Sequence, residues 1–189
     1  MATIVNWISM ANQPRLTAMS LPVGYRFLPT DEELLKHYLI KKVFFRRIPA
    51  NVIPDIHADE LYSKSPKTLV ENLDGKSERE WYFFIHQDDY FYGKIVKDRM
   101  VGINEIQRGF WRSIGEEVPI YNSDGNVFGF KICFAYFNCS ISMAMAKETH
   151  WRMQEYRLPW EFIATDDQER EKWILGRITR GQGYNTSHV

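Results

Sequence analysis

The chain contains little cysteine and no excess of charge of either sign. Of its 189 residues, only Cys133 and Cys139 are cysteines, which is too few for a disulfide framework and indicates a reducing, intracellular compartment. Basic and acidic residues number 24 each, so the chain lacks the net positive charge that is usual in nucleic-acid-binding domains. No apolar run approaches the roughly 20 residues of a membrane-spanning helix, and we expect no membrane partner. Residues 1–20 lack the early positive charge of a secretory signal.

The sequence also lacks the motifs that build most catalytic and cofactor sites. It contains no GxGxxG, GxxxxGK[ST] or GxSxG pattern, and its five histidines fall at no metal-ligand spacing. His86 with the nearby Asp88 and Asp89 comes closest, but a third anchored ligand is missing. Cys133 lies in an apolar stretch, where a cysteine is usually an inert core residue. We therefore expect no catalytic residues, no cofactor and no metal; a metal-dependent enzyme built on His86 would require stoichiometric bound metal.

Charge is distributed unevenly along the chain. Residues 21–47 include six basic and three acidic residues, residues 48–93 four and nine, and residues 94–112 five and two. Such a layout can present a basic face to a polyanion while the whole chain stays neutral. The same charge distribution is also expected for a mixed, solvated surface that binds no polyanion, and this is the simpler interpretation.

The first predicted element is a helix at residues 31–42. Thr30 and Glu33 have the spacing of a capping box, and acidic residues at the start with lysines at the end suit the helix dipole. The apolar stripe of this helix consists of Leu34, Leu35, Tyr38 and Leu39. A second, short helix is predicted at residues 58–62. Both helices precede the part of the chain that is richest in strand signals.

Beyond residue 80 the pattern predicts strands. Aromatic residues make up 15% of the chain and fit pleated, half-buried surfaces. Strands are predicted at residues 80–85, 128–137, 151–158 and 173–178, with turn signals such as Asp124-Gly125-Asn126 between them. The expected core aromatic residues are Trp81, Phe83, Phe134, Trp151, Tyr156 and Trp173. The whole predicts one α+β domain at residues 21–180, with a mostly antiparallel, twisted sheet after N-terminal helices, a flexible leader at 1–20 and a tail at 181–189.

Several segments carry motifs in a recognisable order. The segments are LPVGYRFLPTDEEL at 21–34, a divergent block at 48–73, EWYFF at 80–84, GFWRSIG at 109–115, WRMQEYRL at 151–158 and WILGRI at 173–178. Apart from the divergent block, which stands in the place of the second family block, they resemble LPPGFRFHPTDEEL, EWYFF, GYWKATG, WIMHEYRL and WVLCRI of the NAC-domain family of plant transcription factors. The resemblance covers about residues 21–180. It implies a NAC-type fold, a twisted antiparallel sheet flanked by N-terminal helices.

The resemblance also implies assembly as a homodimer, or as a heterodimer with related NAC proteins, and a nuclear location. In the family an arginine and a glutamate of the first motif pair across the dimer interface. By position these are Arg26 and Glu33, with Leu21, Thr30 and Tyr38 beside them. The alternative interpretation is that Glu33 only caps its own helix.

Double-stranded DNA is the second partner that the resemblance implies. The family's WKATG strand enters the major groove, and Arg112 stands where the family has a lysine, with Trp111 as a packing anchor. An arginine fork suits a guanine edge or a phosphate. The candidate phosphate contacts are Lys94, Lys97, Arg99 and Arg108. The alternative is a strand end anchored by aromatic residues that merely carries exposed basic residues.

Two departures from the family pattern support a different function. The stretch after Phe84 replaces basic residues by His86-Gln87-Asp88-Asp89-Tyr90, and residues 140–150 lack the glycine, proline and most of the positive charge of the family's loop. Fewer phosphate contacts lower the affinity for DNA. The family's long activation region is also missing, so we expect either a fragment or a protein without its own activation function. The leading hypothesis is a dimeric, sequence-specific transcription regulator. The alternative is a NAC-like dimerising protein that binds DNA weakly or not at all and sequesters intact relatives.

Overall fold

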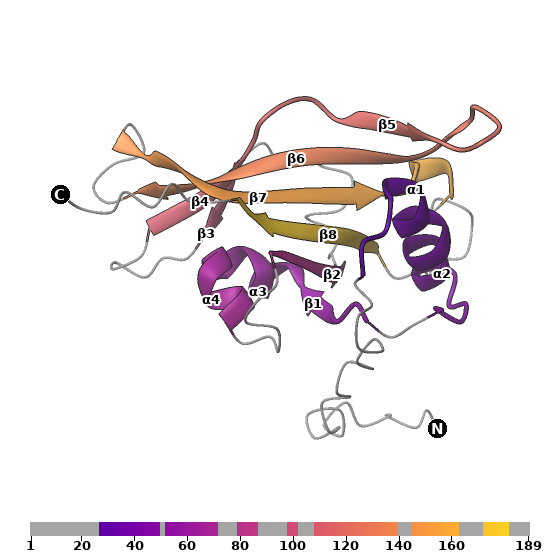
Figure 1. The fold of residues 1–189 in the computed structure, drawn as a ribbon, viewed down its shortest axis with the longest axis horizontal. Coiled ribbons are helices and arrows are strands. Elements are labelled where there is room, and N and C mark those ends of the chain that lie inside the picture. The colour runs from indigo at the N-terminus through magenta and orange to yellow at the C-terminus, as the bar shows by residue number, and fades with distance from the viewer. Residues whose placement is uncertain are drawn as a thin grey trace, which may run out of the picture.

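The computed structural model describes residues 27–49, 52–71, 79–86, 98–101, 108–139, 145–162 and 172–181, with only the backbone at 98–101 and 108. In these ranges the chain forms one twisted sheet with helices near both of its ends (Figure 1). The expected leader, most of the expected tail, and the candidates Leu21, Arg26, Lys94 and Lys97 lie outside them.

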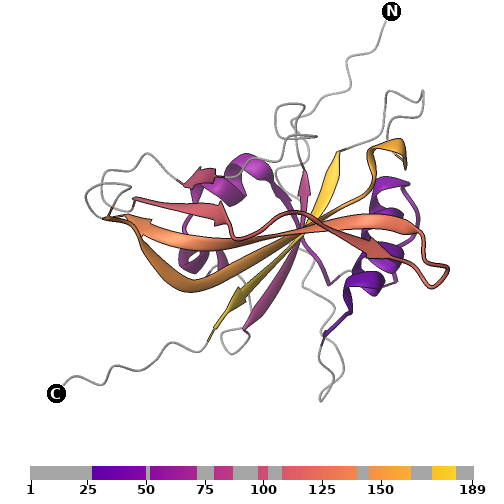
Figure 2. The same ribbon diagram turned by 90° about the horizontal axis from the view of Figure 1, so that it is seen from above.

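The sheet has eight strands. Across it follow β1 (Asp55–His57), β2 (Glu80–His86), β8 (Trp173–Arg180), β7 (Lys147–Arg157), β6 (Val127–Cys139), β4 (Arg108–Ser113) and β3 (Asp98–Val101). The remaining strand, β5 (Val118–Tyr121), pairs with the first half of β6, while β4 pairs with its second half (Figure 2). All pairs are antiparallel except β1 with β2. The predicted fold class is confirmed, with one parallel edge that the sequence did not indicate.

The first helix is continuous over three segments, α1 (Asp31–Glu33), η2 (Leu34–Leu39, with π-type bonding) and α2 (Ile40–Val43). The predicted capping box is present, because the Thr30 N–H donates to Glu33 Oε2 at 2.8 Å and the Glu33 N–H donates to Thr30 Oγ1 at 3.2 Å. At its end Phe45 has a φ of 51° and forms a Schellman motif, a place where glycine is usual. The helix predicted at 31–42 is thereby confirmed.

Two further helices lie near the other end of the sheet (Figure 1). The first, α3 (Ala58–Ser63), confirms the helix predicted at 58–62, whereas α4 (Pro66–Glu71) was not predicted. Ser65 starts α4, since its Oγ accepts the Thr68 N–H at 3.2 Å. A short 3-10 turn, η4 (Trp160–Phe162), follows β7.

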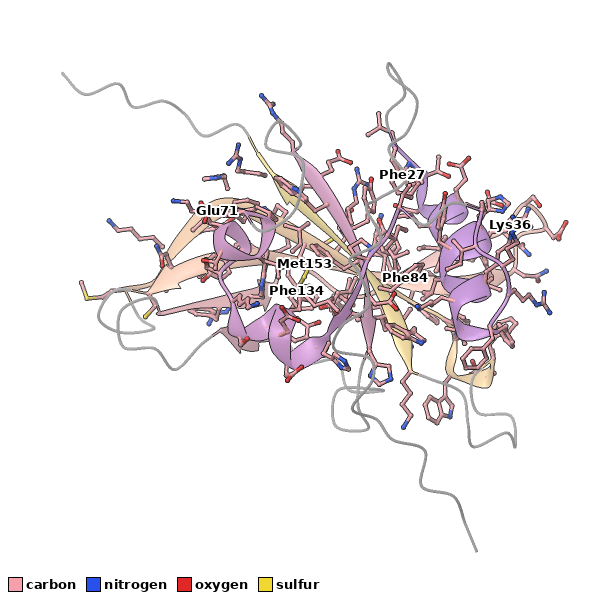
Figure 3. All side chains as sticks on the ribbon, turned by 90° about the horizontal axis from the view of Figure 1, so that it is seen from below. Phe27, Lys36, Glu71, Phe84, Phe134 and Met153 are labelled. Atoms are coloured by element: carbon pink, nitrogen blue, oxygen red, sulfur yellow. The ribbon has the colours of Figure 1, made fainter. Side chains whose placement is uncertain are left out.

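Side chains alternate between the two faces of the sheet and build two cores. Phe134 and Met153 belong to the core under α3 and α4, and Phe84 belongs to the core under the helix at 31–43 (Figure 3). The six predicted core aromatic residues are all buried. Cys133 was expected in the core, but it is only partly buried and lies beside Gln154 of the neighbouring strand; Cys139 is the buried cysteine.

Candidate functional site

The strand that carries the DNA-reading candidate is fixed by its inner face. Trp111 of β4 is 1% exposed and packs edge-to-face on Tyr136 of β6, with ring centroids 5.1 Å apart. Gly109 is required beside it, since a Cβ at that position would lie 2.0 Å from the Tyr136 hydroxyl oxygen. These contacts confirm Trp111 as a packing anchor and set the position of β4 against β6.

The other face of β4 carries Arg112 on an aromatic support. Its guanidinium carbon lies 4.9 Å from the ring centroid of Phe110 and 5.4 Å from that of Phe137. The two rings stack on each other with centroids 5.4 Å apart and planes at 10°. The small Ala135 is the partner directly opposite Arg112 on β6, which leaves room for the arginine to lean over the rings. Arg112 is therefore a half-buried cation with a defined orientation.

The backbone places two more of the candidates on the same pair of strands as Arg112. In the β3–β4 pair, Arg99 stands opposite Trp111 and Asp98 stands opposite Arg112, and Arg108 begins β4. The structure thus brings three of the five DNA-binding candidates onto two adjacent strands. It also brings an acidic residue directly opposite the candidate reader.

Sequence reasoning missed basic residues at the end of the sheet where β4 and β7 begin and β8 ends. Lys147 is exposed at the start of β7, and Arg180 lies over the ring of Trp151, with its guanidinium carbon 5.7 Å from the centroid. The Arg180 N–H donates to the carbonyl of Arg79, which adds a third cation. We call Arg79, Lys147 and Arg180, together with Arg108, the basic end. The sequence gives no local signal for the basic end, because its residues come from different strands and only the pairing of these strands places them at one end of the sheet.

Three of the predicted dimer residues lie in the described ranges, Thr30 and Glu33 at the start of the first helix and Tyr38 further along it. Glu33 is exposed, and the hydrogen bond from the Thr30 backbone N–H, followed by that from its hydroxyl, lowers the pKa of the Glu33 carboxyl. Tyr38 is only 9% exposed and packs edge-to-face on Phe27 at 5.3 Å. Burial, together with the charge of Glu33, raises the pKa of Tyr38. Thr30 and Glu33 therefore face outwards while capping the helix, and most of Tyr38 serves the core.

A polar network ties this helix start to the sheet. Asp31 accepts a hydrogen bond from Lys131 Nζ at 2.5 Å and one from the Tyr156 hydroxyl at 2.6 Å. Burial raises the pKa of Asp31, but the two hydrogen bonds outweigh it and the pKa is lowered overall. Burial and the bond to Asp31 raise the pKa of Tyr156, so the phenol stays protonated as a donor. The network holds the first turn of the helix, which includes Glu33, against β6 and β7.

The described ranges contain neither a cluster of metal ligands nor a membrane-spanning helix. No group of three or more histidine, cysteine, aspartate or glutamate residues there is placed to hold a metal ion. His86 packs on His57 and Trp173 instead, and Asp88 and Asp89 lie outside the described residues. No helix in this part of the chain is long and apolar enough to cross a membrane.

Comparison with known proteins agrees with these features. The family model described as No apical meristem (NAM) protein matches residues 22–158. The chain is 34% identical over 164 residues to NAC domain-containing protein JA2L of Solanum lycopersicum, covering 86% of this chain and 42% of that protein. It is 34% identical to NAC domain-containing protein 72 of Arabidopsis thaliana, covering 86% and 51%. It is also 34% identical to Transcription factor JUNGBRUNNEN 1 of Arabidopsis thaliana, covering 82% and 52%.

The twisted α+β sheet with a capped N-terminal helix is a NAC-type fold. The chain belongs to the NAC (no apical meristem) family. It spans about half the length of the relatives named here, or less.

Proposed function

We propose that this NAC-family regulator binds double-stranded DNA as a dimer in the nucleus, with β4 entering the major groove. The observation that carries the proposal is the position of Arg112 on its aromatic support. A two-stranded β-ribbon fits the major groove, and an arginine there can bond O6 and N7 of a guanine together. The pair β3–β4 supplies such a ribbon at the edge of the sheet. The printed name of one relative, a transcription factor, supports the same function.

The basic end would supply the contacts that hold the duplex without reading it. Arg79, Lys147 and Arg180 lie at the ends of the neighbouring strands β2, β7 and β8, and Lys147 pairs with Asn138 of β6, next to the partner of Arg108. Contacts to phosphates fix the register of a protein on DNA and carry no sequence information. Lys94, Lys97, Arg99 and Arg108 remain our candidates for the same role.

The alternative function, a dimerising partner with weak DNA binding, is favoured by a separate observation. Asp98 stands opposite Arg112 in the register, and Arg152 is held in an ion pair by Glu148. The negative charges of Asp98 and Glu148 repel the phosphate backbone of DNA. They also reduce the number of counterions that binding would release. The two proposals therefore differ in one measurable quantity, the affinity for DNA.

The DNA proposal is tested by binding the protein to an array of short duplexes that covers every sequence. We expect the wild type to prefer one motif, and Arg112→Ala to lower the preference at one base pair by about 1–3 kcal/mol. Circular dichroism checks that the variant is folded. A wild type that binds no duplex at low salt, or binds all of them alike, would leave the non-binding dimeriser as the function.

Dimerisation is tested by separating the two roles of Glu33. Glu33→Gln keeps the hydrogen bonds of a capping box and removes the charge, whereas Arg26→Glu places like charges at both ends of a two-fold interface. We expect light scattering to show a weakened dimer for Glu33→Gln and a monomer for Arg26→Glu, with circular dichroism spectra like that of the wild type. Two variants as dimeric as the wild type would mean that Glu33 serves the helix cap alone.

A further inference from the structure

Two aromatic rings from different strands hold one guanidinium at the candidate DNA-binding strand. Phe110 is fully buried and Phe137 partly buried, and their stacked rings form one platform under Arg112. Phe137 comes from β6, where it is the direct partner of Phe110. The platform therefore depends on the pairing of the strands and not on β4 alone.

Stacking restricts an arginine without using its hydrogen-bond donors. A guanidinium packs on a ring through its flat face, while its five N–H groups point outwards in its own plane. A side chain that is already ordered before binding loses less conformational entropy on binding. Lysine has no flat face and no fork, so the same platform cannot orient it in this way.

We infer that Phe137 is a positioning residue that determines base specificity, and that the platform presets Arg112 to select a guanine in the base pair facing β4. The inference rests on the proposed function, because it needs β4 in the major groove. Guanine is selected because O6 and N7 present two acceptors in one plane, which match the arginine fork. Phe137 itself touches no base in this scheme; it acts through Arg112.

The chain provides a matched control at the other end of the same strand. Phe130 of β6 also lies under an arginine, with the guanidinium carbon of Arg157 at 4.6 Å from its centroid. Arg157 forms a bidentate ion pair with Glu117. This pair lies by the first half of β6, whereas β4 pairs with the second half. Phe130→Leu thus breaks an arginine–ring contact of the same kind without touching the platform.

The experiment compares the wild type, Phe137→Leu, Phe137→Tyr, Phe130→Leu and Arg112→Lys on the complete duplex array. We expect Phe137→Leu and Arg112→Lys to lower the preference for guanine at one base pair by about three- to tenfold, with unchanged preferences elsewhere. Phe137→Tyr keeps a ring and should keep the preference, and Phe130→Leu should leave the whole profile unchanged.

A guanine preference that Phe137→Leu keeps and Arg112→Lys loses would overturn the inference and leave the proposed function standing. A wild type with no motif would instead remove the proposed function itself. If Phe137→Leu is unfolded in thermal melting, Phe137→Met, which fills a similar volume without a ring, takes its place in the comparison.

Discussion

The two ends of β6 handle arginine and lysine in different ways. In its first half, Lys131 is bound by Asp31, and Arg157 of the adjacent β7 is bound by Glu117 while it lies over Phe130. In its second half, the neighbouring cation Arg112 lies over Phe110 and Phe137. The same strand therefore borders a carboxylate-paired end and an aromatic-supported end.

We interpret the difference as one between contacts that hold the fold together and contacts that serve the proposed binding of DNA. A carboxylate consumes the N–H donors of a guanidinium in charge-assisted hydrogen bonds and fixes one element against another. An aromatic ring orients the cation through its flat face and leaves the chemistry of the N–H donors unchanged. The carboxylate-paired end holds the first helix to the sheet, and the aromatic-supported end carries the candidate for reading DNA. Changes at the two ends should accordingly affect different measurements.

The largest effect is expected in the core under α3 and α4, beside the aromatic-supported end. Trp151 is buried against Trp81 in the core under α3 and α4. Trp151→Ala should lower the free energy of unfolding by about 3–5 kcal/mol, because it leaves a cavity. Urea denaturation followed by circular dichroism measures this loss. A variant that melts within a few degrees of the wild type would contradict the role we give this side chain.

A smaller effect is expected from loss of the carboxylate at the carboxylate-paired end. Asp31→Asn keeps the shape but removes the charge that binds Lys131, at a cost of about 1–3 kcal/mol. The folded pKa of Asp31 lies below its unfolded value. Its contribution is therefore present above the unfolded pKa, near 3.9, and is lost as the pH falls through the folded pKa.

Urea titrations across the acidic range check this prediction. The stability of the wild type should fall more steeply with decreasing pH than that of Asp31→Asn, and the two curves should converge in acid. Glu71→Gln is a suitable control, because Glu71 forms only an exposed pair with Lys67 on α4. Parallel curves for wild type and Asp31→Asn would show that Asp31 does not stabilise the fold through its charge.

The sequence was most informative where local patterns and the fold agree. The capping box at Thr30 and the buried stripe of the first helix follow from spacing alone, and the four main strands follow from aromatic and β-branched residues. The helix at 66–71 was missed because it is short and its cap, Ser65, follows the previous helix almost directly. The short strands β1, β3 and β5 were missed because three or four residues give too little periodicity.

The candidate site was predicted in part. Arg112 and its anchor Trp111 were found through one motif, but the platform under Arg112 joins residues that lie 27 positions apart, so that only the pairing of β4 with β6 reveals it. The basic end depends in the same way on several strands meeting at one end of the sheet. Glu117, the partner of Arg157, could not be predicted either, because it lies just before β5, a strand that the sequence did not predict.

The smallest effect is expected from single phosphate contacts at the aromatic-supported end. With about three to five such contacts per subunit, the log–log slope of affinity against salt should lie near −3 to −5. Lys97→Ala or Arg99→Ala should each reduce this slope by about one and weaken binding to all duplexes alike, because phosphates carry no sequence information.

Lys36→Ala removes the same charge from the exposed side of the first helix, near the opposite end of the sheet (Figure 3), and should leave the slope unchanged. Fluorescence anisotropy over a series of salt concentrations measures these slopes. Equal slopes for all four proteins would mean that neither Lys97 nor Arg99 meets a phosphate, and a changed base preference in Lys97→Ala would assign that residue to reading and not to holding the duplex.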